Sequence, residues 1–163
     1  MVSTSGCRLM QEDALDIFIN ELLPLATLLT PNIPEAEILA GMKIENKEDI
    51  MQQPQPSAPG LQARIIKGGH FEGTEKIDYL FANGKLLTSY RGISVNTRNT
   101  HGTGCTLSSA ITSYLAREMD MNTAIAMAKT YLSGAILAGK DVEIGEGHGP
   151  VNHFYEPKSL FTK

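Results

Sequence analysis

Hydrophobic and polar residues alternate along this chain in patterns that predict both helices and strands. In residues 12–23 the apolar positions recur every three or four residues, which predicts an amphipathic helix closed by a proline. A second helix is expected over residues 34–40, which begin with a proline and are followed by a glycine. The two clearest periodic stretches predict helices over residues 104–117 and 122–138.

Short apolar runs predict strands between these helices. Residues 25–30 and 63–66 are suited to buried strands. Residues 77–82 and 85–90 are joined through Asn83-Gly84, a pair that accepts the positive φ angles of a tight hairpin turn. Strands that alternate with helices predict an α/β fold: a layered, mostly parallel sheet with flanking helices and an antiparallel hairpin.

One proline-rich segment interrupts this order. Residues 52–60 contain three prolines and one glycine, which an ordinary helix interior does not tolerate, so a mobile loop is expected there. If Leu28 and Ile65 lie on neighbouring parallel strands, the crossover between them should be helical, and residues 45–51 supply only a fragment of a helix.

Composition narrows the class of protein. The chain has 163 residues, 42% of them hydrophobic, enough for a single domain with a core. Its net charge of -4 argues against nucleic acid or an acidic membrane surface as a partner. Cys7 and Cys105 lack metal-ligand spacing, and no signal peptide or transmembrane pattern is visible, so a reducing cytoplasm is expected.

Residues 99–106 are the segment with the clearest chemistry. Their small residues predict a turn that leads directly into the helix expected from residue 104. Gly102 and Gly104 let the backbone approach a ligand closely, and the first amides of a helix can point together at an anion. Cys105 lies where a helix N-terminus favours thiolate over thiol. The pattern therefore predicts an anion site combined with a nucleophile or base.

Four motifs in order carry a resemblance to a known family. Together with the opening residues 1–6, they make the chain resemble, from Met1 to about Tyr155, the hydroxymethylpyrimidine and phosphomethylpyrimidine kinases of thiamin biosynthesis, which belong to the ribokinase-like superfamily. The motifs are Asn-Ile-Pro-Glu at 32–35, Lys-Gly-Gly-His at 67–70, His-Gly-Thr-Gly-Cys-Thr at 101–106 and Gly-His-Gly-Pro-Val-Asn-His-Phe at 147–154.

The resemblance implies ATP-dependent phosphorylation of an aminopyrimidine alcohol and then of its monophosphate, with Mg²⁺ bound to the triphosphate. The amides of Gly102, Thr103 and Gly104 would bind the transferring phosphoryl group, and Cys105 would help deprotonate the attacking hydroxyl. The base would matter less in the second phosphorylation, because a phosphate monoester is already largely ionised.

The same resemblance implies contacts to the cofactors. Asn32, Lys67, Gly68 and Thr100 would contact the nucleotide, with the lysine acting as a point charge on its phosphates. Glu35 would hold Mg²⁺ or its waters, since hard carboxylate oxygens suit that ion.

Each of these assignments has a plainer alternative. The glycine-rich turn could be only a tight loop, and Cys105 could be a small buried packing residue. Glu35 could be no more than a favourable acid in a first helical turn, and Lys67 a solvated strand end. The histidines at 101, 148 and 153 lack tight metal spacing, which favours turn or hydrogen-bonding roles over zinc ligation.

The resemblance also sets limits on function. Family members carry further strands and the pyrimidine-binding residues upstream of the matched region, so residues 1–163 are expected to form a single, incomplete kinase domain with impaired activity. Two alternatives stay open: a non-catalytic remnant that binds nucleotide, and an enzyme similar to pyridoxal kinase. Related kinases are often dimeric, so a homodimer is a further expectation.

Overall fold

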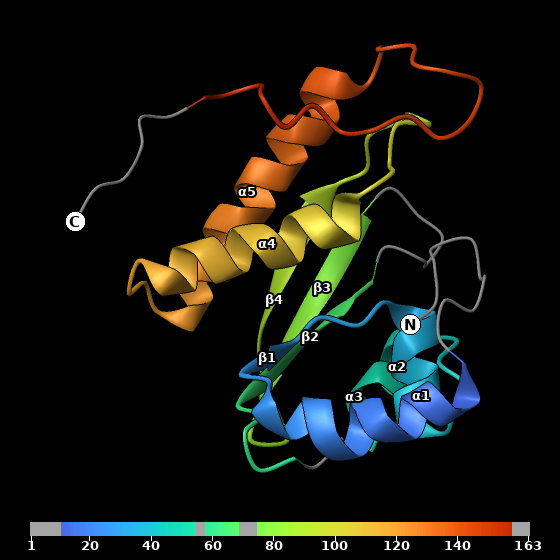
Figure 1. The fold of residues 1–163 in the computed structure, drawn as a ribbon, viewed down its shortest axis with the longest axis vertical. Helices are drawn as coiled ribbons and strands as arrows, with labels where there is room; N and C mark the ends of the chain where they lie inside the picture. The colour runs from blue at the N-terminus through green and yellow to red at the C-terminus, as the bar shows by residue number, and fades with distance from the viewer. Residues whose placement is uncertain (1–10, 55–57, 69–74, 158–163) are drawn as a thin grey trace. The chain divides into compact units, whose positions relative to one another are not determined.

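The computed structural model describes residues 11–54, 58–68 and 75–157 (Figure 1). The chain divides into two compact units, Met1–Arg91 and Gly92–Lys163, which are taken in turn. Within the segment expected to be a mobile loop, residues 55–57 lie outside the described residues. That expectation therefore stays a prediction.

A four-stranded sheet organises the first unit, in the order β1-β2-β3-β4. β1 runs parallel to β2, and β2 pairs antiparallel with β3. At the predicted hairpin turn, Asn83 and Gly84 have φ angles of 49° and 73°, so the positive-φ prediction is confirmed. The strands are β1 (Leu28–Leu29), β2 (Ala63–Lys67), β3 (Glu75–Ala82) and β4 (Lys85–Ile93).

The α/β class is confirmed, but the described sheet contains more antiparallel pairing than the sequence pattern predicts. The connection from β2 to β3 is limited to residues 68–74, and a parallel pair needs a crossover of a dozen or more residues. The expected strand over residues 25–30 is also shorter, because only Leu28 and Leu29 pair with β2.

The first predicted helix forms, but its geometry changes along its length. It comprises α1 (Glu12–Ile17), a π-helical segment η1 (Phe18–Leu22) and a 3₁₀ segment η2 (Leu23–Leu25). Leu23 is buried, whereas 57% of Leu22 is exposed. The apolar stripe predicted for residues 12–23 is therefore not buried along its whole length.

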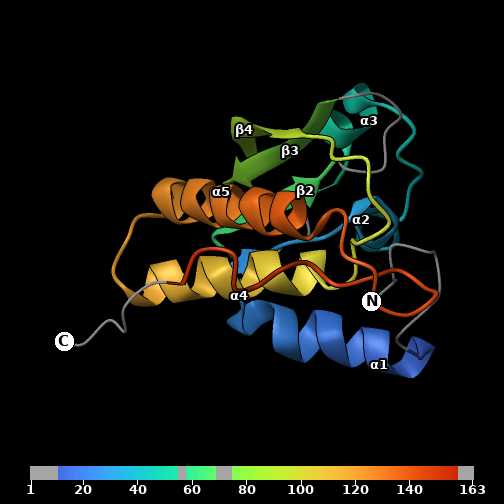
Figure 2. The same ribbon diagram turned by 90° about the horizontal axis from the view of Figure 1, so that it is seen from above.

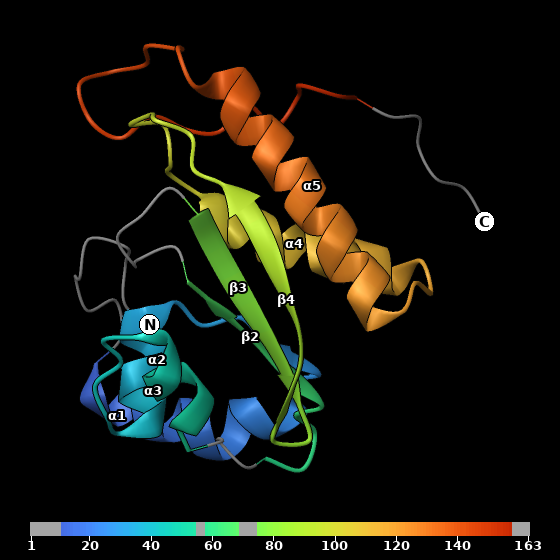
Figure 3. The ribbon, with the colours of Figure 1, turned by 180° about the vertical axis from the view of Figure 1, so that it is seen from behind.

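Two short helices cover one face of the sheet. They are α2 (Ile33–Ala40) and α3 (Lys47–Gln52), and Figure 3 shows both on the same side of the strands. Gly41 ends α2 with a φ of 65°, as the sequence predicts. One hydrophobic core joins these helices to β2 and β3, and it consists of Ile33, Ala36, Ile44, Ile50, Ile66, Tyr79 and Phe81.

A charged residue lies within this unit, which the sequence pattern did not predict. Arg64 on β2 is only 4% exposed, and its guanidinium carbon lies 5.0 Å from the ring centroid of Phe81. Its Nη1 donates to Gln53 Oε1 and to the Pro54 carbonyl, both at 3.4 Å. Burial lowers the pKa of Arg64 to about 10, because desolvation disfavours the charged form.

A helical hairpin forms the second unit. α4 (Thr103–Ala116) and α5 (Met121–Gly139) pack against each other and lie side by side in Figure 2. Glu118 in the connecting turn has a φ of 64°. The bounds agree with the predicted helices 104–117 and 122–138 to within one residue.

None of the helices in the described part of the chain is long and apolar enough to cross a membrane.

The segment after α5 returns along that helix. Asn152 donates its backbone N–H to the Ala135 carbonyl at 3.0 Å, and Tyr131 donates its hydroxyl to the His153 carbonyl at 2.9 Å. The ring of Tyr155 lies against Gly134, where a Cβ would collide with it. Residues 152–155 are thereby fixed to the hairpin.

The N-cap of α5 should make stability depend on pH. Asp120 accepts hydrogen bonds from the backbone N–H of Thr123 at 3.1 Å and from its hydroxyl at 2.6 Å. Chiefly the hydroxyl bond, and then the backbone bond, lower the pKa of Asp120. A lowered carboxyl pKa stabilises the fold above the unfolded pKa, and this contribution is lost as pH falls through the folded pKa.

We expect Asp120→Asn to separate the cap from its titration. Asparagine caps helices about as well as aspartate but carries no carboxyl group. Below about pH 4 the melting temperature of the wild-type chain should therefore fall more steeply than that of the variant. Thermal unfolding of both proteins over a pH series measures this, and parallel pH profiles would contradict it.

Candidate functional site

The predicted glycine turn opens α4. Gly102 is the N-cap residue, with φ 83° and ψ 3°, and its carbonyl accepts the first helical hydrogen bond from the N–H of Thr106 at 2.8 Å. The N–H of Thr103 donates to the Thr100 carbonyl at 3.3 Å. Within the described residues no acceptor is assigned to the N–H groups of Gly104 and Cys105. These two amides can point at an anion, at the positive end of the helix dipole.

Cys105 is exposed at the third position of α4. The alternative that it is a buried packing residue therefore does not hold. Gly102 is glycine for its backbone angle rather than for space, because a Cβ there would meet nothing within 4 Å but would be strained at that positive φ. The turn thus presents two amides and one accessible sulfur.

Residues 148–150, which follow α5, hold this turn in place. The N–H of His101 donates to the Gly149 carbonyl at 3.0 Å, and His101 and Pro150 form a β-bridge. His148 Nδ1 lies 3.1 Å from the Arg98 carbonyl oxygen. Among the residues that the structure describes, no three His, Cys, Asp or Glu side chains gather as a metal-binding group. The backbone N–H of His101 and the ring of His148 instead contact main-chain carbonyl oxygens.

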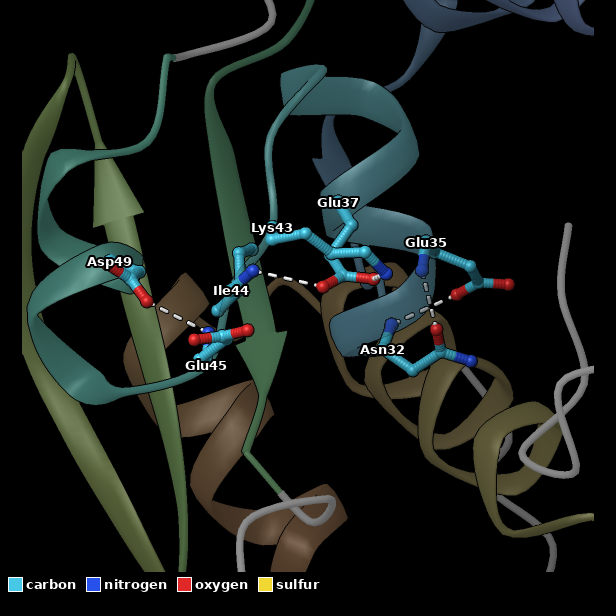
Figure 4. A network of polar contacts seen from close by, with 7 residues as sticks. All are labelled: Asn32, Glu35, Glu37, Lys43, Ile44, Glu45 and Asp49. Carbon is cyan, nitrogen blue, oxygen red and sulfur yellow. Dashed lines mark hydrogen bonds and ion pairs between the residues drawn. The ribbon is translucent and has the colours of Figure 1, made fainter.

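In the first unit, Asn32 and Glu35 form a reciprocal capping box at the start of α2 (Figure 4). Asn32 Oδ1 accepts from the N–H of Glu35 at 2.8 Å, and Glu35 Oε2 accepts from the N–H of Asn32 at 2.9 Å. The carboxylate of Glu35 therefore has at least a structural role, which the sequence analysis gave as its plainer alternative.

Lys67 and Gly68 lie next to this capping box. Asn32 forms a parallel β-bridge with Lys67, whose N–H donates to the Pro31 carbonyl at 3.0 Å. The cluster thus lies where β1 and β2, a parallel pair, reach their carboxyl ends. In α/β sheets, ligands bind at that edge.

Asp78 is a polar residue of this cluster that the sequence analysis missed. It is only 7% exposed, pairs in register with Lys67, and its Oδ1 accepts from the N–H of Gly68 at 3.0 Å. A Cβ on Gly68 would collide with the Ile77 carbonyl oxygen, so close packing against β3 already explains that glycine. A carboxylate between apolar neighbours in a strand was the available signal.

The predicted site residues fall into two groups, one in each unit. Asn32, Glu35, Lys67 and Gly68 lie together in the first unit, and Thr100 and residues 102–105 lie together in the second. Glu35 suits Mg²⁺, which favours oxygen ligands and is usually bound by one or two carboxylates, with water and substrate phosphates completing its shell.

These features define the class of protein: an α/β fold with backbone amides presented at a helix N-terminus, a feature that many phosphate-binding proteins share. Comparison with known proteins identifies the family. The phosphomethylpyrimidine kinase family matches residues 1–152, and this chain belongs to it. The resemblance found in the sequence motifs is thereby confirmed.

Individual relatives agree with this assignment. The hydroxymethylpyrimidine/phosphomethylpyrimidine kinase of Rhizobium meliloti is 44% identical over 157 residues, covering 95% of this chain and 59% of the relative. A crystal structure of phosphomethylpyrimidine kinase from Clostridium difficile is 38% identical, with a TM-score of 0.67 over 83% of this chain and 54% of that one. The chain thus spans about 59% of the curated relative's length.

The solved structure of an enzyme with a different named activity is also similar to this chain. An ADP complex of Bacillus subtilis pyridoxal kinase is 31% identical and gives a TM-score of 0.78, covering 89% of this chain and 56% of that one. The ribokinase-like expectation agrees with this relationship.

Proposed function

We propose that this chain supplies the nucleotide-phosphate part of a kinase that transfers the γ-phosphoryl group of ATP to hydroxymethylpyrimidine and to its monophosphate. The observation that carries the proposal is the start of α4, where the amides of Gly104 and Cys105 and the exposed thiol lie together. Membership of the phosphomethylpyrimidine kinase family supports the substrate class, and the ADP complex of a structural neighbour supports the nucleotide.

In the proposed reaction, the hydroxyl oxygen of the pyrimidine attacks the γ-phosphorus of ATP. A new O–P bond forms, the bond from that phosphorus to the bridging oxygen breaks, and ADP leaves with the electron pair. The sulfur of Cys105 accepts the hydroxyl proton. The two amides stabilise the charge on the transferring group, and each well-placed donor contributes about 3 kcal/mol.

Residues of the first unit would bind the nucleotide and its cation. Lys67 places a positive charge at the carboxyl end of β2. Glu35 would hold Mg²⁺, which, when bound, neutralises phosphate charge, and Asn32 fixes the position of that carboxylate through the capping box.

Two measurements on the chain test this function. Isothermal titration calorimetry with ATP measures nucleotide binding, and a coupled assay of ADP release measures turnover with hydroxymethylpyrimidine as acceptor. Binding of ATP together with slow turnover is the expected result, in line with the impaired activity expected from the sequence. Binding without turnover would instead identify a remnant that keeps only nucleotide affinity, and absence of both would contradict the proposal.

Pyridoxal is a second candidate acceptor, because the TM-score to the pyridoxal kinase exceeds that to the phosphomethylpyrimidine kinase. Sequence identity favours the opposite order, at 38% against 31%. Running the coupled assay with both alcohols decides between them. Faster turnover of pyridoxal would show that pyridoxal, and not the pyrimidine, is the preferred substrate.

Replacement of Lys67 by methionine should weaken ATP binding by about tenfold or more, since a hydrogen bond to a charged group contributes about 1.5–3 kcal/mol. Lys85→Met, at the exposed start of β4, removes the same charge away from the cluster and should leave affinity unchanged. Titration calorimetry of both variants with ATP measures the difference. Equal affinities for the two variants would show that Lys67 does not contact the phosphates.

Three expectations about the whole protein stay predictions. They are a cytoplasmic location, assembly as a homodimer, and the organisation of residues 1–163 as one incomplete kinase domain. Size-exclusion chromatography with light scattering would test the second of them.

A further inference from the structure

Asn99 is a buried polar residue at the start of the phosphate-binding turn, and the proposed reaction gives it no role. Only 1% of its surface is exposed. Its Nδ2 donates to the carbonyl oxygens of Gly139, at 2.7 Å, and Val142, at 2.6 Å. One side chain therefore joins the residue before Thr100 to the C-terminal end of α5 and to the loop that follows.

The orientation of this carboxamide is fixed by its neighbours. Two carbonyl oxygens can only accept, so the group that faces them must be the NH₂ group. Oδ1 then lies against Gly149, where a Cβ would collide with it, and it has no hydrogen-bond partner among the described residues. A buried acceptor without a partner is unfavourable, and native structures contain few such groups.

The backbone on either side of Asn99 is tied to the same elements. Its N–H donates to the Thr97 hydroxyl at 3.0 Å, and that hydroxyl donates to the Lys140 carbonyl at 2.8 Å. On the other side, the N–H of His101 donates to the Gly149 carbonyl at 3.0 Å. The approach to the turn thus contacts the end of α5 on one side and residue 149 on the other.

We propose that Asn99 is a positioning residue for the phosphate-binding turn. By bonding to the end of α5 and to the loop that follows it, and by lying against Gly149, its carboxamide sets the direction in which the amides of Gly104 and Cys105 point. This inference rests on the proposed function, because it assigns those amides to a phosphoryl group. Asn99 itself is too deeply buried to contact that group.

The test compares Asn99→Ala with Asn96→Ala, which removes an exposed asparagine from the same loop. The first readout is the pair of amide NMR resonances of Gly104 and Cys105 in the chain without nucleotide. The second is the ATP dissociation constant and the ratio of kcat to KM, measured well below the melting temperature of each variant. A residue that only stabilises the fold lowers that temperature without changing these constants.

We expect Asn99→Ala to shift both amide resonances and to lower turnover by about 10²-fold, since a displacement of about 1 Å at a reacting group has that effect. Asn96→Ala should change neither. Unshifted resonances together with unchanged ATP affinity in a folded Asn99→Ala protein would overturn the proposal. If this variant does not fold, Gly149→Ala, which displaces the same carboxamide, is judged by the same two readouts.

The two proposals fail separately. If the wild-type chain does not bind ATP, the proposed function fails, and the resonances of the free chain still decide whether Asn99 positions the turn. If the chain binds and turns over ATP but the resonances and constants are the same in both variants, only the role of Asn99 is overturned.

Discussion

Replacement of Cys105 by alanine is expected to lower the rate of hydroxymethylpyrimidine phosphorylation by about 10²- to 10⁴-fold, the usual contribution of a general base. ATP affinity should be unchanged, because the variant keeps the backbone amides of Gly104 and of residue 105. The coupled assay of ADP release gives the rate, and titration calorimetry gives the affinity. A loss of affinity equal to the loss of rate would instead indicate a collapsed turn.

The acceptor offers an internal control for this variant. The monophosphate of the pyrimidine is already largely ionised, so its phosphorylation should lose much less rate in Cys105→Ala than that of the alcohol. Ser109→Ala changes an exposed residue on the same helix and should leave both rates unchanged. Equal losses for the two acceptors would contradict a proton-accepting role for the sulfur.

Replacement of Ile66 by alanine is expected to lower the free energy of unfolding by about 2–5 kcal/mol, through the lost transfer energy and the cavity left behind. Ile66 is fully buried on β2, in the core shared with α2, α3 and β3. Urea unfolding followed by circular dichroism measures the change.

Two variants calibrate that result. Ile66→Val leaves most of the side chain and should cost about 0.5–1.5 kcal/mol. Ile93→Ala removes a side chain that is 85% exposed, and its effect should lie within about 0.5 kcal/mol of zero. Similar losses for Ile66→Ala and Ile93→Ala would show that the first unit does not depend on this core.

Local signals in the sequence were sufficient for the helical hairpin and the β-hairpin. α4 and α5 have a helical apolar period over several turns, and Asp120 caps the second of them. Asn83-Gly84 has the backbone freedom that a two-residue turn requires. In each case neighbouring residues determine the structure, so no distant contact was needed to predict it.

Features that depend on distant partners could not be predicted. A strand was predicted over residues 25–30, but the short length of β1 is set by its pairing with Ala63 and Arg64. The burial of Arg64 depends on Gln53, which follows α3, and on Phe81 of β3, whose positions no local pattern gives. The π-helical geometry of η1 likewise has no signal in a pattern that simply continues the preceding helix.

Some features of the candidate site could likewise be predicted from local sequence, and others depend on distant contacts. The turn at Gly102 follows from glycine spacing and the start of a helix, whereas the exposure of Cys105 was left open by the sequence and comes from the structure. The bridge between Asn32 and Lys67 joins residues 35 positions apart, the difference of their sequence numbers, and only the fold reveals it. Asn99 bonds to residues 40 and 43 positions later in the chain, so its buried contacts could not be predicted from local sequence.

The outer strand of the sheet has a consequence for handling the protein. In the described part of the chain β4 ends the strand order, and Leu87 and Ile93 are 58% and 85% exposed. Such an edge can template strand addition from another molecule, so we expect concentrated solutions to aggregate. Lys85 and Arg91 lie at and near the ends of β4, and their charges should oppose this pairing of strands between molecules.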